Sequence, residues 1–254
     1  MSQLFDDLVQ IFARLRNPED GCPWDLKQTP DTLREYIIEE AHELTEAISD
    51  GDVRKQKEEL GDLFLQVLFL SRIMEEKNHF DINDVMKTLK EKLIRRHPHI
   101  FQQKMKLTDD QVKNNWEKIK KKEKSKESII SDYPDTMPAL SVSKRISEQA
   151  ASVGFDWPDS SQIHGKINEE LNEILKAKTI EEKNEECGDL LFAVVNLCRH
   201  LRVHPELALK AANRKFTERF RYLENKISDL KQDITSQTLP ELEALWQESK
   251  FRRQ

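Results

Sequence analysis

Acidic side chains stand in this sequence where an amphipathic helix should carry apolar ones. Residues 37–44 read IIEEAHEL, and at about 100° per residue Glu40 projects from the middle of the apolar arc of the predicted helix, with Glu43 at its edge. Burial of an ionised carboxylate without a partner costs several kcal/mol. We therefore expect either that this arc is exposed or that a positive charge meets Glu40.

The helix predicted next presents two more acids. Glu59 and Asp62 lie on a common side of a segment that apolar residues otherwise surround, a pattern typical of a helix buried on most faces. Antiparallel packing of the two helices would bring these carboxylates together with Glu40 and Glu43. Because four acids in one pocket cannot all stay ionised without cations, the pattern predicts a cation site.

The chain carries this pattern twice. Three segments of the first half return in the same order in the second: GCPWD at 21–25 as GFDW at 154–157, EEAHE at 39–43 as EELNE at 169–173, and ELGDLFLQVL at 59–68 as ECGDLLFAVV at 186–195. The second set of acids is Glu170, Glu173, Glu186 and Asp189. Gly61 and Gly188 also match, and a glycine kept inside both helices suggests close approach by another backbone.

The donor set indicates which metal these acids would bind. Oxygen ligands, with no histidine or cysteine common to both halves, suit Mg²⁺, and Mn²⁺ is the second choice. Mg²⁺ commonly keeps positions open for water and substrate phosphates, so the site predicts phosphate chemistry. An isolated EExxE pattern is more often a solvated helix face, but its duplication within apolar helices favours the site.

Positively charged residues that could contact phosphates follow in each half. The candidates are Lys92 and Arg96 in the first half, Lys215 and Arg219 in the second, each pair at i, i+4, and Lys166, one turn before Glu170, in the second half only. Tryptophan is more often a core residue than a ligand contact, and among the four in this chain Trp246 is our choice for stacking on a base.

Composition and pattern predict an all-α protein. Six glycines and nine prolines are few for 254 residues, and no alternating strand pattern competes with the helical one. The expected helices are about 2–16, 31–49, 53–77, 82–97 and 108–123 in the first half and 138–152, 162–178, 180–203, 205–230 and 240–249 in the second. We predict two tandem homologous helical bundles, residues 1–120 and 138–254, joined by a linker at 121–137.

Charge and hydropathy exclude several classes of partner. The 41 basic and 47 acidic residues are well mixed along the chain, so no basic face suggests nucleic-acid binding. The apolar run at 63–70 is too short to span a bilayer, and the N-terminal segment lacks the features of a secretion signal. Three cysteines without metal spacing fit a reducing cytoplasm.

Two other functions are compatible with an all-α fold. A di-iron carboxylate bundle needs Glu-x-x-His pairs, and Glu39 with His42 and Glu76 with His79 have that spacing. However, the position of His42 is occupied by Asn172 in the second half, so histidine is dispensable to the repeat. A non-catalytic interaction module would explain the amphipathic helices but not the acids within their apolar faces.

The motifs together resemble one family. RLRNPEDGCPWDLKQT, EEAHEL, EELGDLFLQV and RRHPHIF in the first half, with VGFDW, EELNE, ECGDLLFAVVNLCRHL and KFTERF in the second, closely resemble the two-domain MazG nucleoside triphosphate pyrophosphohydrolases. The resemblance covers nearly the whole chain. EExxE with ExxD alone would indicate only the broader superfamily of all-α pyrophosphohydrolases.

The resemblance implies an enzyme that hydrolyses nucleoside triphosphates to a monophosphate and pyrophosphate, as a homodimer, in nucleotide-pool cleaning. It implies that Glu170, Glu173, Glu186 and Asp189 hold Mg²⁺, that Lys215, Arg219 and Trp246 contact the nucleotide, and that the C-terminal copy is the principal active domain. One glutamate should accept a proton from the attacking water, and Glu169, just outside the metal arc, is our choice. The N-terminal copy retains every acid, so nothing visible in the sequence disables it.

Overall fold

The computed structural model describes residues 3–102, 105–109, 111–112, 115–116, 119, 123, 128–130 and 132–251. Within these residues every regular element is a helix, which confirms the predicted all-α fold. The chain divides into two compact units, Met1–Leu107 and Thr108–Gln254. Each unit is built around a pair of antiparallel helices, and we describe each unit by itself.

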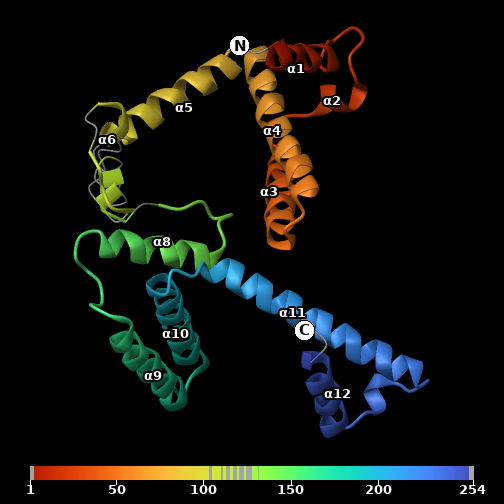
Figure 1. Cartoon of the computed structure of the whole chain (residues 1–254), viewed down its shortest axis with the longest axis vertical. Coiled ribbons are helices and arrows are strands. Elements are labelled where there is room, and N and C mark those ends of the chain that lie inside the picture. The colour runs from red at the N-terminus through yellow and green to blue at the C-terminus, as the bar shows by residue number, and fades with distance from the viewer. Residues whose placement is uncertain are drawn as a thin grey trace. The chain divides into compact units, whose positions relative to one another are not determined.

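The first unit is organised by the hairpin of α3 and α4. Its helices are α1 (Gln3–Leu15), α2 (Pro23–Lys27), α3 (Leu33–Asp50), α4 (Val53–Glu76), α5 (Ile82–Arg96) and α6 (Pro98–Phe101). The α3–α4 turn is tight because Gly51 takes a left-handed conformation (φ 72°) and the Asp52 side chain caps α4. Helix α1 packs on α4, whereas α5 leads away from it (Figure 1).

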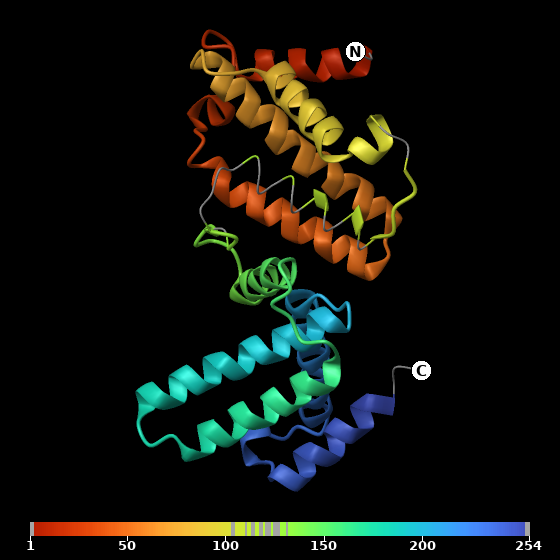
Figure 2. The same cartoon turned by 90° about the vertical axis from the view of Figure 1, so that its left-hand side faces the viewer.

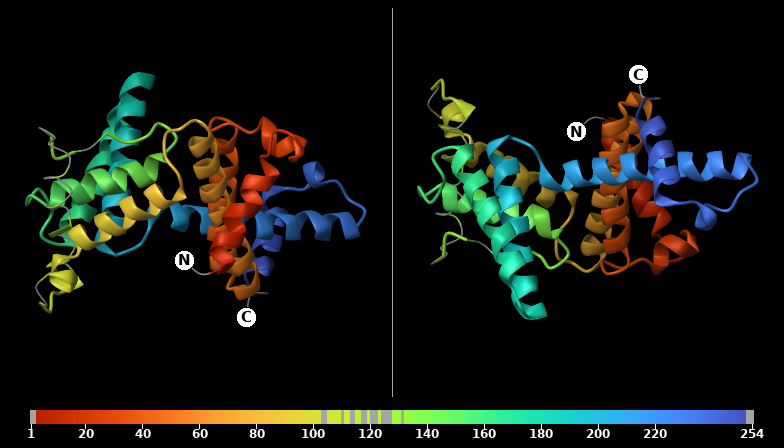
Figure 3. Two further views of the ribbon diagram at one scale, coloured as in Figure 1. Left: turned by 90° about the horizontal axis from the view of Figure 1, so that it is seen from above. Right: turned by 90° about the horizontal axis from the view of Figure 1, so that it is seen from below.

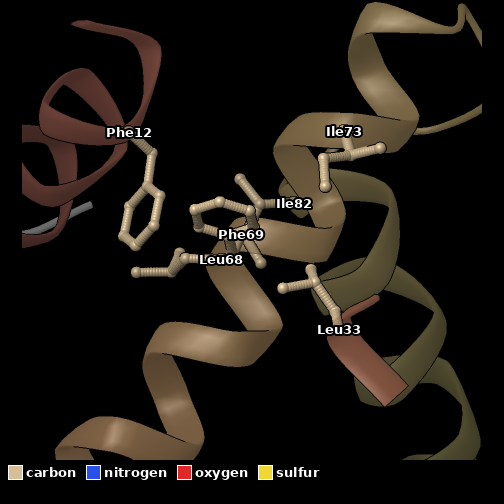
Figure 4. Close-up of a cluster of buried hydrophobic side chains, with 6 residues drawn as sticks. All are labelled: Phe12, Leu33, Leu68, Phe69, Ile73 and Ile82. Carbon is tan, nitrogen blue, oxygen red and sulfur yellow. The ribbon is translucent and has the colours of Figure 1, made fainter. Parts of the chain in front are cut away.

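The hydrophobic core of this unit lies at the end of the hairpin far from that turn. Its buried members, drawn in Figure 4, are Phe12, Leu33, Leu68, Phe69, Ile73 and Ile82. The ring of Phe12 meets that of Phe69 edge to face, with centroids 5.6 Å apart. The acids of α3 and α4 therefore lie on the stretch of hairpin between the core and the turn.

Arg16 ties the segment before α3 to this core. Its guanidinium group is 2.7 Å from the Glu76 carboxylate, lies over the ring of Phe69, and donates hydrogen bonds to the backbone carbonyls of Asp25 and Gln28. Trp24, on the tethered segment, meets Tyr36 of α3 at a centroid distance of 5.9 Å. Because Arg16 is 8% exposed, these contacts are made largely out of water.

Gly21 fixes the course of the same segment for a different reason. A side-chain carbon at Gly21 would stand 2.4 Å from the carbonyl oxygen of Asn17 and 2.5 Å from that of Leu15. No larger residue fits without moving the backbone.

The second unit repeats the helix pair. Its elements are α8 (Ala139–Ala151), α9 (Ser160–Lys176), α10 (Ile180–His200), α11 (Pro205–Asp229), the 3₁₀ turn η1 (Ile234–Ser236) and α12 (Leu239–Phe251). Helices α9 and α10 lie side by side as α3 and α4 do (Figure 2), but the turn is closed by a capping box between Thr179 and Glu182. Helix α8 packs on α10 and α11, and the long α11 carries α12 (Figures 1 and 3).

One charged cluster holds the segment before α9. Asp156 accepts hydrogen bonds from Arg199, and its carboxylate is 3.0 Å from Nε2 of His200. Burial alone would raise the pKa of Asp156, but the hydrogen bonds from Arg199 and His200 lower it. In each unit, then, a cationic side chain anchors the segment that leads into the acid-bearing hairpin.

The long helices begin and end within a few residues of their predicted bounds. The short elements α2, α6 and η1 were not predicted. The helix expected at 108–123 and the predicted linker at 121–137 lie only partly within the described residues. The division between the units falls after Leu107 rather than near residue 120, and the predicted domain limits of 1–120 and 138–254 stay a prediction.

The prediction that α4 is buried on most faces was wrong. Leu60, Phe64 and Val67 are 56%, 41% and 41% exposed, because no described element covers this side of α4. The equivalent positions of α10, Cys187, Leu191 and Val194, are exposed as well. A side-chain carbon at Gly61 or Gly188 would meet no described atom within 4 Å beyond its own helix, so the expected close approach of another backbone is not found among the described residues.

We predict that Arg16→Gln lowers the free energy of unfolding by about 2 kcal/mol, because it removes one of the two cationic partners of Glu76 and the donor to two backbone carbonyl oxygens. Urea denaturation measures the change. Arg14→Gln, exposed in the last turn of α1 just before Arg16, is the matched control and should change stability by less than about 0.5 kcal/mol. Equal effects of the two substitutions would show that the Arg16 contacts do not stabilise the unit.

Candidate functional site

The first unit gathers its acids between α3 and α4. Glu40, Glu59 and Asp62 can each bring one carboxylate oxygen within 4.8 Å of the others. Glu43 lies at the rim, exposed to solvent and hydrogen-bonded to the carboxyl group of Glu59. Glu59 is only 5% exposed. The four acids that the sequence singles out in this half therefore converge on one place.

Their proximity changes how these acids titrate. Burial raises the pKa of Glu40 above its ordinary value of 4.5, and the negative charges of Asp62 and Glu43 raise it further. Burial likewise raises the pKa of Glu59, followed by the charge of Glu43. The folded protein thus holds protons on these groups more tightly than an unfolded chain does.

Gln66 belongs to this cluster, although sequence reasoning missed it. It follows Asp62 by one turn of α4, is 6% exposed, and its side-chain hydrogen bond to Glu40 lowers the pKa of that carboxyl group. Its Oε1 is buried without a hydrogen-bond partner. The available signal was a polar residue inside the run LFLQVLFL, on the same side as Asp62. The second half has Ala193 at this position.

The second unit forms the equivalent cluster between α9 and α10. Glu170, Glu186 and Asp189 can bring carboxylate oxygens within 4.8 Å of one another, and Glu170 also does so with Glu169 and Glu173. Glu170 is 2% exposed, the most deeply buried acid among the described residues. Burial raises the pKa of Glu186, and the charges of Glu173 and Glu170 add to that effect.

Lys166 meets this second cluster directly. Its Nζ is 2.6 Å from Oε1 of Glu170 and 2.8 Å from Oε1 of Glu169. These hydrogen bonds, first to Glu169 and then to Glu170, raise the pKa of Lys166 above its ordinary value, so it stays protonated at neutral pH. The other oxygen of Glu170, Oε2, is buried and has no hydrogen-bond partner.

The remaining predicted contacts of the second half form a separate group on α11 and α12. The Arg219 guanidinium lies 5.7 Å from the centre of the Trp246 ring, and the Phe216 ring is 4.9 Å from the same ring. Lys215 is exposed one turn before Arg219. Across the described residues, no ion pair joins Lys215 or Arg219 to the carboxylates of α9 and α10.

A hydrogen bond and an ion pair connect α12 to α11. Glu248 accepts a hydrogen bond from the Tyr222 hydroxyl and lies 3.5 Å from Nζ of Lys226.

In the first half, Lys92 and Arg96 lie on α5, which leads away from α4 (Figure 1). No ion pair connects them to the first-unit acids within the described part of the chain. A single copy of each unit therefore does not bring all the predicted site residues together.

The donor set fits a hard divalent cation. Both clusters offer carboxylate oxygens, and the buried Oε2 of Glu170 and Oε1 of Gln66 have no donor of the protein's own. Among the described residues, no group of three or more possible ligands contains a histidine or cysteine. Glu76, from one Glu-x-x-His pair, is engaged by Arg16 and Arg72, so that pair does not form a di-iron site.

Comparison with known proteins agrees with this geometry. Residues 28–101 match the MazG nucleotide pyrophosphohydrolase domain, which includes all of the first-unit cluster. The chain is 47% identical to the nucleoside triphosphate pyrophosphohydrolase/pyrophosphatase MazG of Thermotoga maritima, over 97% of this chain and 96% of that protein. It is 39% identical to the nucleoside triphosphate pyrophosphohydrolase of Escherichia coli, over 98% of each chain.

A further relative is a longer protein that this chain matches over part of its length. The uncharacterized protein YabN of Bacillus subtilis is 42% identical over 97% of this chain, which spans 51% of YabN. The matches to the Thermotoga and Escherichia proteins run almost end to end, so they cover both acid clusters as well as α11 and α12. The chain belongs to the MazG nucleotide pyrophosphohydrolase family.

Proposed function

We propose that this protein hydrolyses nucleoside triphosphates to nucleoside monophosphate and pyrophosphate with the help of Mg²⁺. The observation that carries the proposal is the buried carboxylate of Glu170, which keeps an oxygen without a donor inside a cluster of acids that the chain repeats. The names of the two full-length relatives support the same reaction. Cleaning of the nucleotide pool in the cytoplasm is the cellular role we infer.

Each acid cluster has a part in this proposal. Glu170, Glu173, Glu186 and Asp189 would hold Mg²⁺ in the second unit, and Glu40, Glu43, Glu59 and Asp62 would do so in the first. The ion, when bound, would balance phosphate charge and activate water. Mn²⁺ could replace it, since both ions accept oxygen ligands.

The other site residues act on the nucleotide. Glu169, exposed beside the buried Glu170, would accept the proton of the attacking water. Lys215 and Arg219 would balance the charge of the leaving pyrophosphate, and Trp246 would stack on the base. Lys166 would contact a phosphate. Lys92 and Arg96 would play the equivalent part in the first half.

We propose the second unit as the principal catalytic domain. Its cluster contains the most deeply buried acid and has a lysine of its own. The first unit keeps all four acids and matches the family domain, so we expect it to bind a metal as well.

A homodimer is part of the proposal. The exposed apolar residues of α4 and α10 lie on the helices that carry the acids, at equivalent positions in the two units. A second copy would cover these residues and could bring the basic side chains of one chain to the acids of the other. Membranes and nucleic acids are not expected as partners, and no helix within the described residues is long and apolar enough to cross a bilayer.

We predict that Glu170→Gln lowers kcat for nucleoside triphosphate hydrolysis at least about a hundredfold, because loss of a direct metal ligand should cost no less than loss of an outer-shell partner. Glu40→Gln should have a smaller effect. Monophosphate and pyrophosphate are measured by chromatography over a panel of nucleotides with Mg²⁺. Equal losses in both variants would make both units catalytic, and no turnover of any nucleotide would favour a binding module.

The raised pKa values of Glu40 and Glu59 predict a pH dependence of stability. A carboxyl group whose pKa is raised by folding destabilises the folded state as pH rises from about 4.5 through the raised value. Without metal, the unfolding free energy of Glu40→Gln should therefore fall less than that of the parent protein between pH 4.5 and pH 7. With Mg²⁺ bound, the parent protein should be the one whose unfolding free energy falls less. Urea denaturation with EDTA or Mg²⁺ measures both effects, and Glu46→Gln on the exposed side of α3 is the control.

A further prediction concerns the homodimer. Val67→Lys combined with Val194→Lys should raise the dimer dissociation constant at least tenfold, because burial of an unpaired charge costs several kcal/mol. Light scattering over a range of concentrations measures it. Leu4→Lys combined with Leu175→Lys places the same charges at exposed leucines of α1 and α9 and should leave the constant unchanged. Dimers of unchanged stability in the valine variant would exclude these faces as the interface.

A further inference from the structure

Lys166 occupies part of the cation site in the second unit. Its ammonium group pairs with one oxygen of Glu170 at 2.6 Å, and the second oxygen of that carboxylate has no partner. Glu170 is also the most deeply buried member of the cluster. A divalent ion that binds Glu170 must therefore share this carboxylate with the lysine or displace it.

The lysine can leave this position more easily than the acid can. The side chain of Lys166 is 38% exposed and that of Glu170 is 2% exposed. A lysine has a long flexible stem and three donors, and it can turn towards another anion without disturbing the helix. The triphosphate of a bound nucleotide would supply such an anion.

The first unit provides a comparison within the same chain. Tyr36 lies four residues before Glu40, where the second half has Lys166 four residues before Glu170. In the described part of the chain, no lysine or arginine forms an ion pair with Glu40, Glu59 or Asp62. Lys55 lowers the pKa of Glu59 by its charge but makes no ion pair with it. The amide of Gln66, a neutral group, is the donor that Glu40 has instead.

We propose that Lys166 is a counter-cation that competes with the divalent ion for Glu170, and that nucleotide binding removes this competition by drawing the ammonium group to the phosphates. The inference rests on the proposed function and extends it. Metal and nucleotide then bind cooperatively in the second unit, since each favours the state in which Lys166 has left Glu170. The first unit, which has Tyr36 in this place, binds the metal without needing the nucleotide.

The test measures Mn²⁺ affinity by electron paramagnetic resonance on the full chain without nucleotide. In a Glu40→Gln background, which leaves the second site, Lys166→Met should tighten Mn²⁺ binding on the order of tenfold, a typical size for coupling between sites. Lys166→Arg keeps the positive charge and should leave the affinity weak. Lys176→Met removes the same charge from the exposed end of α9 and is the matched control.

The reciprocal change tests the first unit. In a Glu170→Gln background, which leaves the first site, Tyr36→Lys should weaken Mn²⁺ binding by a similar factor, while Tyr36→Met should not. The Glu40→Gln/Glu170→Gln double variant measures non-specific binding, and circular dichroism shows that each variant is folded.

Cooperativity has its own readout. The affinity of an α,β-methylene nucleoside triphosphate, which resists cleavage between the α and β phosphates, is measured by calorimetry with and without Mn²⁺. Mn²⁺ should increase the affinity for this nucleotide by a smaller factor in Lys166→Met than in Lys176→Met.

The outcomes separate this inference from the proposed function. Unchanged or weaker Mn²⁺ binding in Lys166→Met would overturn the competition and leave the metal site in place. No Mn²⁺ binding at the second site in any variant would overturn both the metal site and the competition.

Discussion

The structure depends on burying carboxylates between two antiparallel helices. An ionised acid in such a place needs a positive charge or hydrogen-bond donors, and the protein supplies few: the ammonium group of Lys166 in the second unit and the neutral amide of Gln66 in the first. Which acids face one another is set by the turn that joins the helices. Gly51 with Asp52 forms one turn and the Thr179 capping box forms the other. Two different turns therefore place the acids of the paired helices so that they face one another.

Much of this arrangement could be predicted from the sequence because it depends on helical periodicity. The spacing of Glu40 within an apolar arc and of Glu59 and Asp62 on the next helix is enough to place these acids together once the helices pair. Because the pattern is repeated, the same reasoning predicts an acid cluster in the second half. The long helices follow for the same reason, since their caps and apolar spacing are local features of the chain.

The misses have physical causes as well. An apolar position on α4 or α10 has the same pattern whether its own chain or another chain covers it, so exposure of Phe64 and Leu191 could not be foreseen. Gln66 was overlooked because an amide within an apolar run has no charge to mark it. The ion pair of Lys166 with Glu170 was not predicted, because it depends on the rotamers of both side chains, which spacing does not determine.

The two copies of the repeat have kept their acids and changed their neighbours. Tyr36 and Gln66 in the first unit stand where Lys166 and Ala193 stand in the second. The ion pair between Lys166 and Glu170 therefore has no counterpart at Glu40 among the described residues, although the helices that carry the acids are alike. A duplicated frame with altered neighbours allows the two sites to respond differently to the same ion.

The anchor of the first unit has a different response to acid from that of the site it supports. The Arg16 guanidinium keeps its charge at any pH at which a protein folds. Burial alone would raise the pKa of its partner Glu76, but the hydrogen bonds and charges of Arg16 and Arg72 lower it, whereas the pKa values of Glu40 and Glu59 are raised. On acidification the first-unit cluster takes up protons while the Arg16–Glu76 pair is still ionised. Mild acid should thus empty the cation site of a unit that remains folded, and neutralisation should restore the site without refolding.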